Sequence, residues 1–533
     1  MSVIDIHGHP LDASLGPRWQ RSVALAQQGD LAGASGEMEA LLSAHPGFAP
    51  GILQLAQFRL ARGHYRQAME TAAALMDAPL PTLEFAWHAV RLLRRFELHE
   101  AVARVAGRAP WPHSSDARLL HAVASELVPI GLYDLARPLL ERAGRLAPRV
   151  APLQVTRGTL DFVSGDLEAS RQRLRAAASV PGPHVAHALW LLSMQPEDDR
   201  IDSDLEATAA ALRSVPDGSG DAAYLAFAMH NLHHAAGQYE AAWQALAQGC
   251  AIKQRTSDHD PVAQARLFDA LGSMHVSGVA TPVPVDASVR PVFIVGMYRS
   301  GTSVLERVLS GHPDVADGGE SQVMPAALRL AFDRPARSTV DLSMVVEADR
   351  VDLAPAASFF RRHARWKAGG RAVFTEKLPE NFLLAGFILA AMPEARILHM
   401  QRDPMDTCFS NLRTFFSGAA PYSYDQATLA DYYSGYRRLM DHWRALYPER
   451  ILDVDYQRFV DDPGPETERV LAFCGLDYRP HLLDVGRQGG YSATASIGSV
   501  RAGIQRNRGG AWRPYAAHLA PLREALGHLS GPW

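Results

Sequence analysis

The sequence predicts two structural units: an all-α domain of helical repeats and an α/β domain in which helices cover both faces of a parallel sheet. Three observations predict this division. A short motif recurs through the first 250 residues, strand-length apolar runs replace helical periodicity after Pro291, and the first of these runs ends in a glycine-bounded loop. We expect the repeat domain over residues 1–275, a linker over residues 276–290 and the α/β domain over residues 291–533.

The repeated motif is a glycine, then a leucine or tyrosine, then a small residue three positions later. The Leu/Tyr and small residues are Leu31 and Ala34, Tyr65 and Ala68, Leu98 and Ala101, Tyr133 and Ala136, Leu167 and Ser170, and Tyr239 and Ala242. Successive Leu/Tyr positions lie 34, 33, 35, 34 and then 72 residues apart, so a degenerate unit is expected near Leu205. The glycine should end one helix, the Leu/Tyr should be buried, and the small residue should let paired helices approach closely.

A helix–turn–helix unit of this length resembles the tetratricopeptide repeat (TPR). A stack of such units forms a TPR-like solenoid with a concave surface. That surface is expected either to bind a protein partner or acceptor, or only to brace the neighbouring domain, and the sequence leaves both open.

The composition excludes several classes of protein. The chain has 53 Lys plus Arg and 57 Asp plus Glu, a formal net charge of −4, which does not favour nucleic-acid or membrane-surface binding by bulk charge. Three scattered cysteines, Cys250, Cys408 and Cys474, are too few for a disulfide framework or a zinc site. No targeting segment is visible, and no apolar run reaches the roughly 20 residues of a membrane span. We therefore expect a cytoplasmic protein.

After Pro291, four apolar runs each end in a polar cluster. The runs are residues 292–295 before the Gly-Met-Tyr-Arg-Ser-Gly-Thr-Ser loop, 372–374 before Thr-Glu-Lys377, 397–400 before Gln-Arg402, and 451–454 before Asp-Tyr456. Segments with helical periodicity lie between them. This alternation predicts a parallel sheet, and ligands bind such sheets at the carboxyl ends of the strands, where all four clusters fall.

The loop from Gly296 to Ser303 has the glycine spacing of a phosphate loop. Backbone N–H groups of such a loop, together with the N-terminus of the helix that follows, bind an anion. In nucleotide triphosphatases a lysine follows the second glycine and contacts the β- and γ-phosphates, whereas here Thr302 follows Gly301. The loop therefore predicts a nucleotide with a short 5′ anion, held by hydroxyl groups and by Arg299.

This loop, with the Leu-Ser-Gly-His-Pro-Asp-Val segment after it, resembles the 5′-phosphosulfate loop of the sulfotransferases. It is most similar to the bacterial TPR sulfotransferases and the tyrosylprotein sulfotransferases, and the likeness runs from Pro291 to Trp512. The resemblance implies a P-loop-like, three-layer sulfotransferase domain and 3′-phosphoadenosine 5′-phosphosulfate (PAPS) as cosubstrate, with no metal required. The residues it assigns to the 5′-phosphosulfate are Arg299, Ser300, Gly301, Thr302 and Ser303.

A second anion site is expected around Arg402 and Ser410. Arg402 ends an apolar run, Pro404 suits a first helical turn, and Ser410 lies on the predicted helix. An arginine fork with a hydroxyl group is a sound phosphate clamp. The family pairs an arginine and a serine at this separation, which implies that these two residues bind the 3′-phosphate.

Sulfuryl transfer needs a base for the acceptor proton and a cation for the leaving group. The resemblance implies that Glu320 is the base and that Lys377, assisted by Arg299, meets the bridging oxygen. We expect Glu320 to be enclosed, because burial raises the pKa of a carboxylate. His312 and His399 are rival bases, but a helix end and a mid-strand position favour structural roles for them.

Other residues carry weaker expectations. The resemblance implies that Tyr456 faces the nucleotide and that Ser496 belongs to a segment closing over it, whereas roles for Arg501 and Arg506 stay open. An aromatic stretch follows the 3′-phosphate helix, and core packing is favoured over an acceptor cleft for it; its members are Phe415, Phe416, Tyr422, Tyr424, Tyr432, Tyr433 and Tyr436. The acceptor is expected to carry a hydroxyl group and to be a peptide tyrosine, a glycan, a lipid or a metabolite.

Two other functions compete with a PAPS-dependent sulfotransferase. One is a nucleotide kinase-like P-loop enzyme, against which the threonine at the lysine position counts. The other is a non-catalytic TPR scaffold with an inert nucleotide domain, against which the presence of Glu320 and Lys377 counts. Binding of PAPS, PAP (the 3′,5′-bisphosphate product) and ATP would separate all three.

Overall fold

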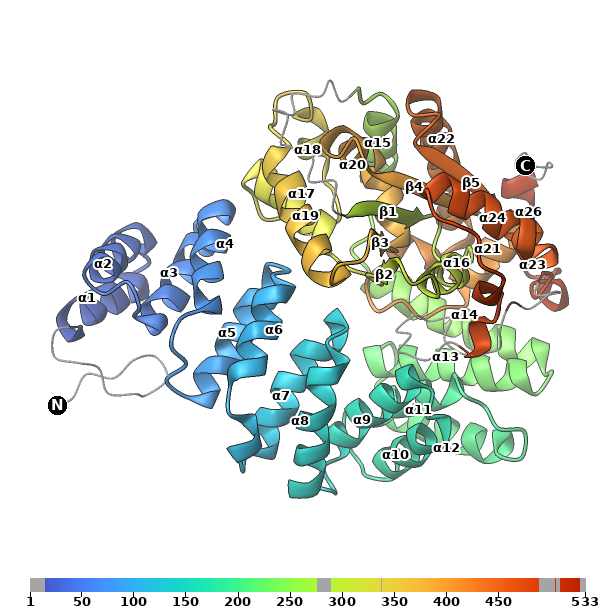
Figure 1. The fold of residues 1–533 in the computed structure, drawn as a ribbon. Helices are drawn as coiled ribbons and strands as arrows, with labels where there is room; N and C mark the ends of the chain where they lie inside the picture. The colour runs from blue at the N-terminus through green and yellow to red at the C-terminus, as the bar shows by residue number, and fades with distance from the viewer. Residues whose placement is uncertain (1–14, 276–288, 337, 488–503, 505–508, 528–533) are drawn as a thin grey trace.

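The computed structural model describes residues 15–275, 289–336, 338–487, 504 and 509–527. A solenoid of helix pairs extends from the N-terminal side and curves along one side of an α/β domain (Figure 1). This confirms the predicted fold class. The predicted linker falls mostly outside the described residues, and the domain limits at residues 275 and 291 stay predictions. Within the described residues, no helix is both long and apolar enough to cross a membrane.

Fifteen α-helices, with three short 3-10 helices between them, make up the part of the chain before residue 276 that the structure describes. They are α1 (Gly16–Gln27), α2 (Leu31–Ala44), α3 (Ala49–Ala61), α4 (Tyr65–Ala73), α5 (Leu83–Arg95), α6 (His99–Arg108), α7 (Ala117–Leu127), α8 (Tyr133–Leu146), α9 (Ala151–Ser164), α10 (Leu167–Ala178), α11 (Val185–Ser193), α12 (Ile201–Ser214), α13 (Gly220–Ala235), α14 (Tyr239–Thr256) and α15 (Pro261–Gly272).

The repeat motif marks the turn inside each helix pair. Its glycines adopt the left-handed backbone conformation, as at Gly63 with φ 83° and Gly165 with φ 89°. In the unit without a glycine, Glu97 adopts φ 55° instead, so the turn is kept at the cost of backbone strain. The small residues of all six motifs are buried, as predicted, and allow close helix pairing. The expected burial of the Leu/Tyr position is confirmed at Tyr65 and Tyr133 only. Leu31, Leu98 and Leu167 are partly buried, and Tyr239 is 40% exposed.

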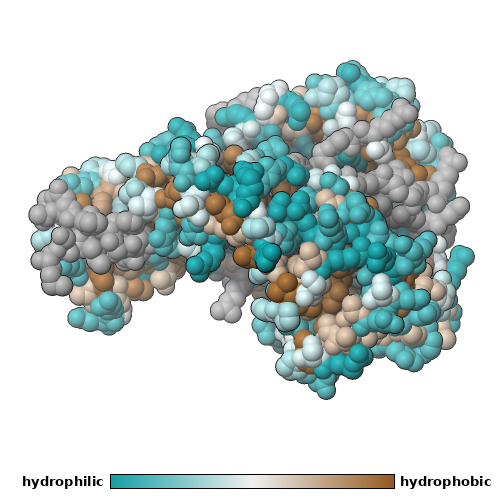
Figure 2. Space-filling model, turned by 90° about the horizontal axis from the view of Figure 1, so that it is seen from below, coloured by the Kyte–Doolittle hydropathy of each residue, from teal (hydrophilic) through white to brown (hydrophobic). Residues whose placement is uncertain are grey.

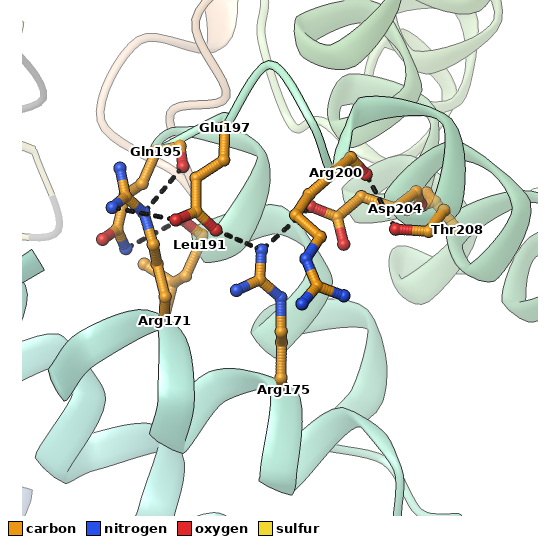
Figure 3. Close-up of polar contacts among 9 residues, drawn as sticks. Arg171, Arg175, Leu191, Gln195, Glu197, Arg200, Asp204 and Thr208 are labelled. Carbon is orange, nitrogen blue, oxygen red and sulfur yellow. Dashed lines mark hydrogen bonds and ion pairs between the residues drawn. The ribbon is translucent and has the colours of Figure 1, made fainter. Parts of the chain in front are cut away.

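The degenerate unit is the pair α11 and α12. Thr208 occupies its small position and is buried, three residues after Leu205. The turn between these helices is longer than in other units and is held by ion pairs to α10 (Figure 3). Arg175 pairs with Glu197 at 2.5 Å and with Asp204 at 3.5 Å. Side-chain pairs therefore replace the glycine turn in this unit.

The α/β domain contains a parallel sheet of five strands in the order β2-β3-β1-β4-β5. The strands are β1 (Arg290–Val295), β2 (Val315–Asp317), β3 (Val373–Glu376), β4 (Arg396–Gln401) and β5 (Ile451–Asp455). The helices are α16 (Thr302–Ser310), α17 (Val323–Phe332), α18 (Leu342–Val346), α19 (Ala354–Ala368), α20 (Ala385–Ala391), α21 (Pro404–Leu412), α22 (Gln426–Leu446), α23 (Tyr456–Asp461), α24 (Pro463–Cys474) and α26 (Ala520–Leu526). The four predicted strands are confirmed, and β2, just before Gly318, is a fifth.

Alternate residues of the central strand β1 serve two separate cores. Val292 and Ile294 pack with the apolar residues of α16, α23 and α24. Phe293 faces the opposite side, where its ring lies 5.0 Å from that of Phe360 on α19. Helices therefore cover both faces, and only the carboxyl ends of the strands and the loops that follow them are left to build a site.

The solenoid is docked on the α/β domain through polar and aromatic contacts. The hydrogen bonds across the junction include Arg66 Nη2 to Ala331 O (3.0 Å), Lys253 Nζ to Ser417 O (2.9 Å), Gln254 Nε2 to Tyr424 O (2.7 Å) and His234 Nδ1 with the Tyr515 hydroxyl (2.8 Å). The face seen from below is mostly hydrophilic, with hydrophobic side chains in separate patches (Figure 2). This pattern fits a solenoid that buries most apolar residues between its helices and against its neighbour.

Candidate active site

The loop between β1 and α16 depends on two glycines for its path. Gly296 has φ 155°, and a Cβ atom there would lie 2.7 Å from the carbonyl oxygen of Met400. Gly301 has φ 106°, and a Cβ atom there would collide with the ring of Tyr456. Neither position can carry a side chain without displacing its neighbour. Their close approach to β4 and α23 sets the position of the loop relative to the strand ends.

The loop residues have the features of an anion cradle. Arg299 adopts φ 69°, a left-handed conformation that non-glycine residues rarely take. Ser300 is buried, and its Oγ atom has no hydrogen-bond partner among the described residues. Thr302 and Ser303 are the first two residues of α16, so the N-terminus of that helix begins where the loop ends. A buried hydroxyl group without a protein partner beside a helix N-terminus is suited to an anionic ligand.

The structure brings the two predicted anion sites together. Arg299 Nε donates to Ser410 Oγ at 3.2 Å, and Arg402 Nη1 donates to the carbonyl oxygen of Arg299 at 3.3 Å. The guanidinium group of Arg402 lies 4.7 Å from the ring centre of Tyr456. The local expectations are confirmed: β4 ends just before Arg402, and Pro404 begins α21, which carries Ser410.

Two residues that sequence reasoning missed hold these elements in place. Asn411 Nδ2 donates to the carbonyl oxygen of Tyr298 at 2.7 Å, which ties α21 to the loop. Asp406 accepts a hydrogen bond from the backbone N–H of Gly510 at 2.7 Å, which ties the chain's last described segment to the same helix. Asn411 and Asp406 lie on the predicted 3′-phosphate helix, and that position is the only sequence signal for their role. Ser496, Arg501 and Arg506 lie outside the described residues.

Glu320 and Lys377 form an ion pair at the next strand ends. The pairing follows from the backbone, because Gly318 N donates to Thr375 O at 2.8 Å and Lys377 N donates to Gly319 O at 2.9 Å. Lys377 is 0% exposed, whereas the side chain of Glu320 is 37% exposed, so the expected enclosure of Glu320 is wrong. The reason is that the glutamate follows the short strand β2 at the edge of the sheet, where no strand covers it.

Lys377 has a second carboxylate neighbour that sequence reasoning missed. Glu306 Oε2 on α16 lies 3.6 Å from Lys377 Nζ. Burial lowers the pKa of Lys377, but the carboxylates of Glu320 and Glu306 outweigh it and the net shift is upward. The ammonium form of Lys377 is therefore favoured although its own side chain is buried.

The rival histidines are engaged in structural contacts. His312 Nε2 lies 3.2 Å from the carbonyl oxygen of Asp477. His399 lies between the carboxylate of Asp453, at 2.8 Å, and the hydroxyl group of Tyr436, at 2.5 Å. Burial lowers the pKa of His399, an effect that Asp453 opposes. Both histidines are buried, and among the described residues neither forms a hydrogen bond or ion pair with Glu320 or Lys377.

The aromatic stretch divides into core and rim. Its five tyrosines are buried, as core packing predicts. Phe415 and Phe416 are only partly buried. Phe416 lies 5.3 Å from the ring of Tyr298 in the loop, and Phe415 lies 4.2 Å from the ring of Tyr224 on α13. These two phenylalanines therefore connect the loop to the solenoid.

Replacing Gly301 by alanine is expected to destabilise the protein, because a left-handed conformation and the ring of Tyr456 both oppose a Cβ atom. We expect the free energy of unfolding to fall by about 1–3 kcal/mol in urea denaturation. Gly36→Ala on α2 is the control, since its Cβ would meet no atom within 4 Å. Equal stability of the two variants would contradict the close contact between loop and ring.

Comparison with known proteins finds one family that part of the chain resembles. Residues 291–480 match the model of the sulfotransferase family, which confirms the resemblance predicted from the loop. An uncharacterized protein of Aquifex aeolicus (strain VF5) is 30% identical over 249 residues, which cover 45% of this chain and 32% of that protein. Protein-tyrosine sulfotransferase 2 of Gallus gallus is 24% identical over 259 residues, 45% of this chain and 64% of that one.

The alignments thus span less than two thirds of either relative's length. A solved sulfotransferase from Alicyclobacillus acidocaldarius is 22% identical and covers 45% of this chain and 95% of that one, with a TM-score of 0.26. A score that low adds nothing to the sequence match.

Proposed function

We propose that this protein transfers a sulfuryl group from PAPS to a hydroxyl-bearing acceptor. The observation that carries the proposal is the ion pair between Glu320 and the buried ammonium of Lys377, formed at strand ends beside the loop to which we assign the donor's anion. A base and a cation for the leaving group are the two chemical requirements of this reaction beyond binding. The family match of residues 291–480 supports the same reaction.

The donor nucleotide would be held at both of its anionic ends. Ser300 to Ser303 would bind the 5′-phosphosulfate through hydroxyl groups, loop N–H groups and the N-terminus of α16. Arg402 and Ser410 would bind the 3′-phosphate, with Arg299 between the two groups. The direct contacts of Arg299 with Ser410 and Arg402 support one continuous binding site. Tyr456 would pack against the nucleotide from α23, and a role for Ser496 stays a prediction.

The transfer step would use the residues at the strand ends. The acceptor oxygen attacks sulfur in line, the bond from sulfur to the bridging oxygen of PAPS breaks, and the products are the sulfated acceptor and PAP. Glu320 takes the proton of the acceptor hydroxyl group. Lys377, assisted by Arg299, neutralises the charge that develops on the bridging oxygen. We propose no metal ion in this step.

The acceptor is proposed only as a class. A peptide tyrosine, a glycan, a lipid and a metabolite all carry a suitable hydroxyl group. Because the Gallus gallus relative is named a protein-tyrosine sulfotransferase, a peptide tyrosine is the first acceptor to test. The solenoid approaches the loop through Phe415, so we propose that its inner surface contributes to acceptor or protein-partner binding. We also propose a cytoplasmic, bacterial setting, with which three buried free thiols agree.

Calorimetry with the full chain tests the proposal. We expect PAPS and PAP to bind, and ATP with Mg²⁺ to bind at least about tenfold more weakly, because Thr302 stands where a triphosphatase has its lysine. Transfer of radioactive sulfate from PAPS to a tyrosine peptide or a simple phenol would establish the activity. Tight ATP binding with turnover would favour a kinase, and binding of none of these nucleotides would favour a scaffold.

Replacing Arg402 by alanine should weaken PAP binding much more than binding of adenosine 5′-phosphate, since only PAP carries the 3′-phosphate. The loss of a charged hydrogen-bond partner costs about 1.5–3 kcal/mol, or roughly tenfold to a hundredfold in affinity. Calorimetric titration of both ligands measures the difference. Equal weakening of the two would mean that Arg402 does not bind the 3′-phosphate.

A further inference from the structure

Glu306 is a buried carboxyl group that the proposed reaction leaves without a role. It lies in the second turn of α16, only 7% exposed, with one oxygen 3.6 Å from Lys377 Nζ. Its other oxygen, Oε1, has no hydrogen-bond partner among the described residues. An ionised carboxylate in such a position destabilises the fold unless a cation compensates its charge, and Lys377 supplies one.

The charge balance around Lys377 changes during the proposed reaction. At rest, the ammonium has two carboxylates within ion-pair distance, Glu320 and Glu306. When Glu320 takes the acceptor proton it becomes neutral and no longer compensates the charge of Lys377. Solvent water cannot replace it, because the ammonium group is 0% exposed. After PAP leaves, Glu306 is the remaining carboxylate within ion-pair distance of Lys377 in the described part of the chain.

We propose that Glu306 is a positioning residue that holds the ammonium of Lys377 in place while Glu320 is protonated. The proposal rests on the proposed function, because it assigns Glu320 as the base. Glu306 reaches Lys377 from the helix that starts at the loop, whereas Glu320 reaches it from the edge of the sheet. The two carboxylates therefore come from different elements, and one can release Lys377 while the other keeps it.

The surrounding charges define what the test must distinguish. Burial raises the pKa of Glu306 well above its ordinary range. Asp317 adds to the rise through its charge and through a side-chain hydrogen bond, Glu320 adds to it as well, and Lys377 opposes it. Asp317 follows on β2 and accepts a hydrogen bond from Gly319 N at 2.8 Å. A protonated Glu306 would be neutral, and Glu320 would then be the carboxylate that compensates the charge of Lys377. The test must therefore measure the protonation of Lys377 directly.

The chain makes that measurement simple because it has three lysines, Lys253, Lys367 and Lys377. With lysine labelled at Cε and Nζ, the full-length protein gives three signals, assigned by single Lys→Arg variants. Glu320→Gln reproduces the neutral state of the base. In that variant Lys377 should stay protonated, whereas in Glu320→Gln/Glu306→Gln its pKa should fall by at least about two units, a hundredfold loss in proton affinity.

The matched control is Glu320→Gln/Glu376→Gln. Glu376 is also buried and ends β3 directly before Lys377, but its Oε1 accepts from Asn381 Nδ2 at 3.1 Å instead of pairing with Lys377. This control should leave the titration of Lys377 unchanged. An equal pKa of Lys377 with and without Glu306 would overturn the proposal, and so would an equal fall in the Glu376 control.

Single Glu306→Gln gives a second readout if the double variant does not fold. We expect PAP affinity within about threefold of the parent protein and turnover lowered about tenfold or more. As the pH is raised, the rate should begin to fall at a lower pH than in the parent, because Lys377 loses its proton more readily. Glu306→Asp, which keeps the negative charge, should restore part of the activity at alkaline pH. Unchanged turnover in Glu306→Gln would overturn the proposal. Absence of PAP binding in the parent protein would instead contradict the proposed function.

Discussion

Replacing Glu320 by glutamine is expected to lower turnover by about 10²–10⁴ while PAP affinity stays nearly unchanged. The amide keeps the size of the side chain but cannot accept the acceptor proton. Because Glu320 pairs with Lys377 and takes no part in the hydrogen bonds among Arg299, Arg402 and Ser410, nucleotide binding should depend little on its charge. Initial rates at saturating PAPS, together with calorimetry of PAP, measure both quantities.

The histidine variants supply the control for this result. His312→Asn should retain turnover in the folded protein, because its ring contacts the backbone of Asp477 rather than the strand ends where Glu320 lies. Full activity in Glu320→Gln would exclude that carboxylate as the base. Loss of activity in His312→Asn, with normal PAP binding, would then transfer the role to the histidine.

Replacing Phe268 by alanine is expected to lower the free energy of unfolding by about 3–5 kcal/mol. Phe268 lies on α15, is buried, and packs 5.1 Å from the ring of Tyr432 and 6.4 Å from that of Phe382. A Cβ atom on Gly435 would lie 2.7 Å from the Phe268 ring, so α22 is shaped to receive it. Urea denaturation of the full chain, followed by circular dichroism, measures the change.

Val262→Ala is the matched control on the same helix. Val262 is 60% exposed and should change the free energy of unfolding by no more than about 0.5 kcal/mol. Similar free energies of unfolding for the Phe268 and Val262 variants would contradict a stabilising role for the contact between α15 and α22. The same contacts imply that a shortened chain beginning after α15 would expose the side chains of Phe382 and Tyr432, because Phe268 would no longer cover them.

Much of the fold was predictable because it is encoded in short-range patterns. Helix pairing follows from a motif of a few consecutive residues at the turn between two helices. The small residues of this motif, such as Ala68 and Ala136, are buried where the paired helices meet. The strands follow from apolar runs bounded by polar clusters. Their polar ends were expected to meet because parallel strands share one carboxyl edge, and the contact of Glu320 with Lys377 agrees with that expectation.

The errors have local physical causes. Burial of Tyr239 is the prediction, but its helix ends the row of regular pairs. Its ring packs against those of His234 and Tyr515 on one side and stays 40% exposed. Glu320 was expected to be enclosed, but it follows an edge strand of three residues. A motif specifies which residue occupies a position, whereas exposure depends on which other elements cover it.

The sequence by itself determined the repeats, the strands and the chemical types of the site residues, because these depend on neighbours a few positions away. Only the tertiary structure decided that Arg299 meets Ser410, that Glu306 meets Lys377, and that α15 packs on α22. These contacts join residues far apart in the chain. They depend on the order of strands in the sheet and on the direction in which the solenoid curves, and neither leaves a signal in the local pattern of residues.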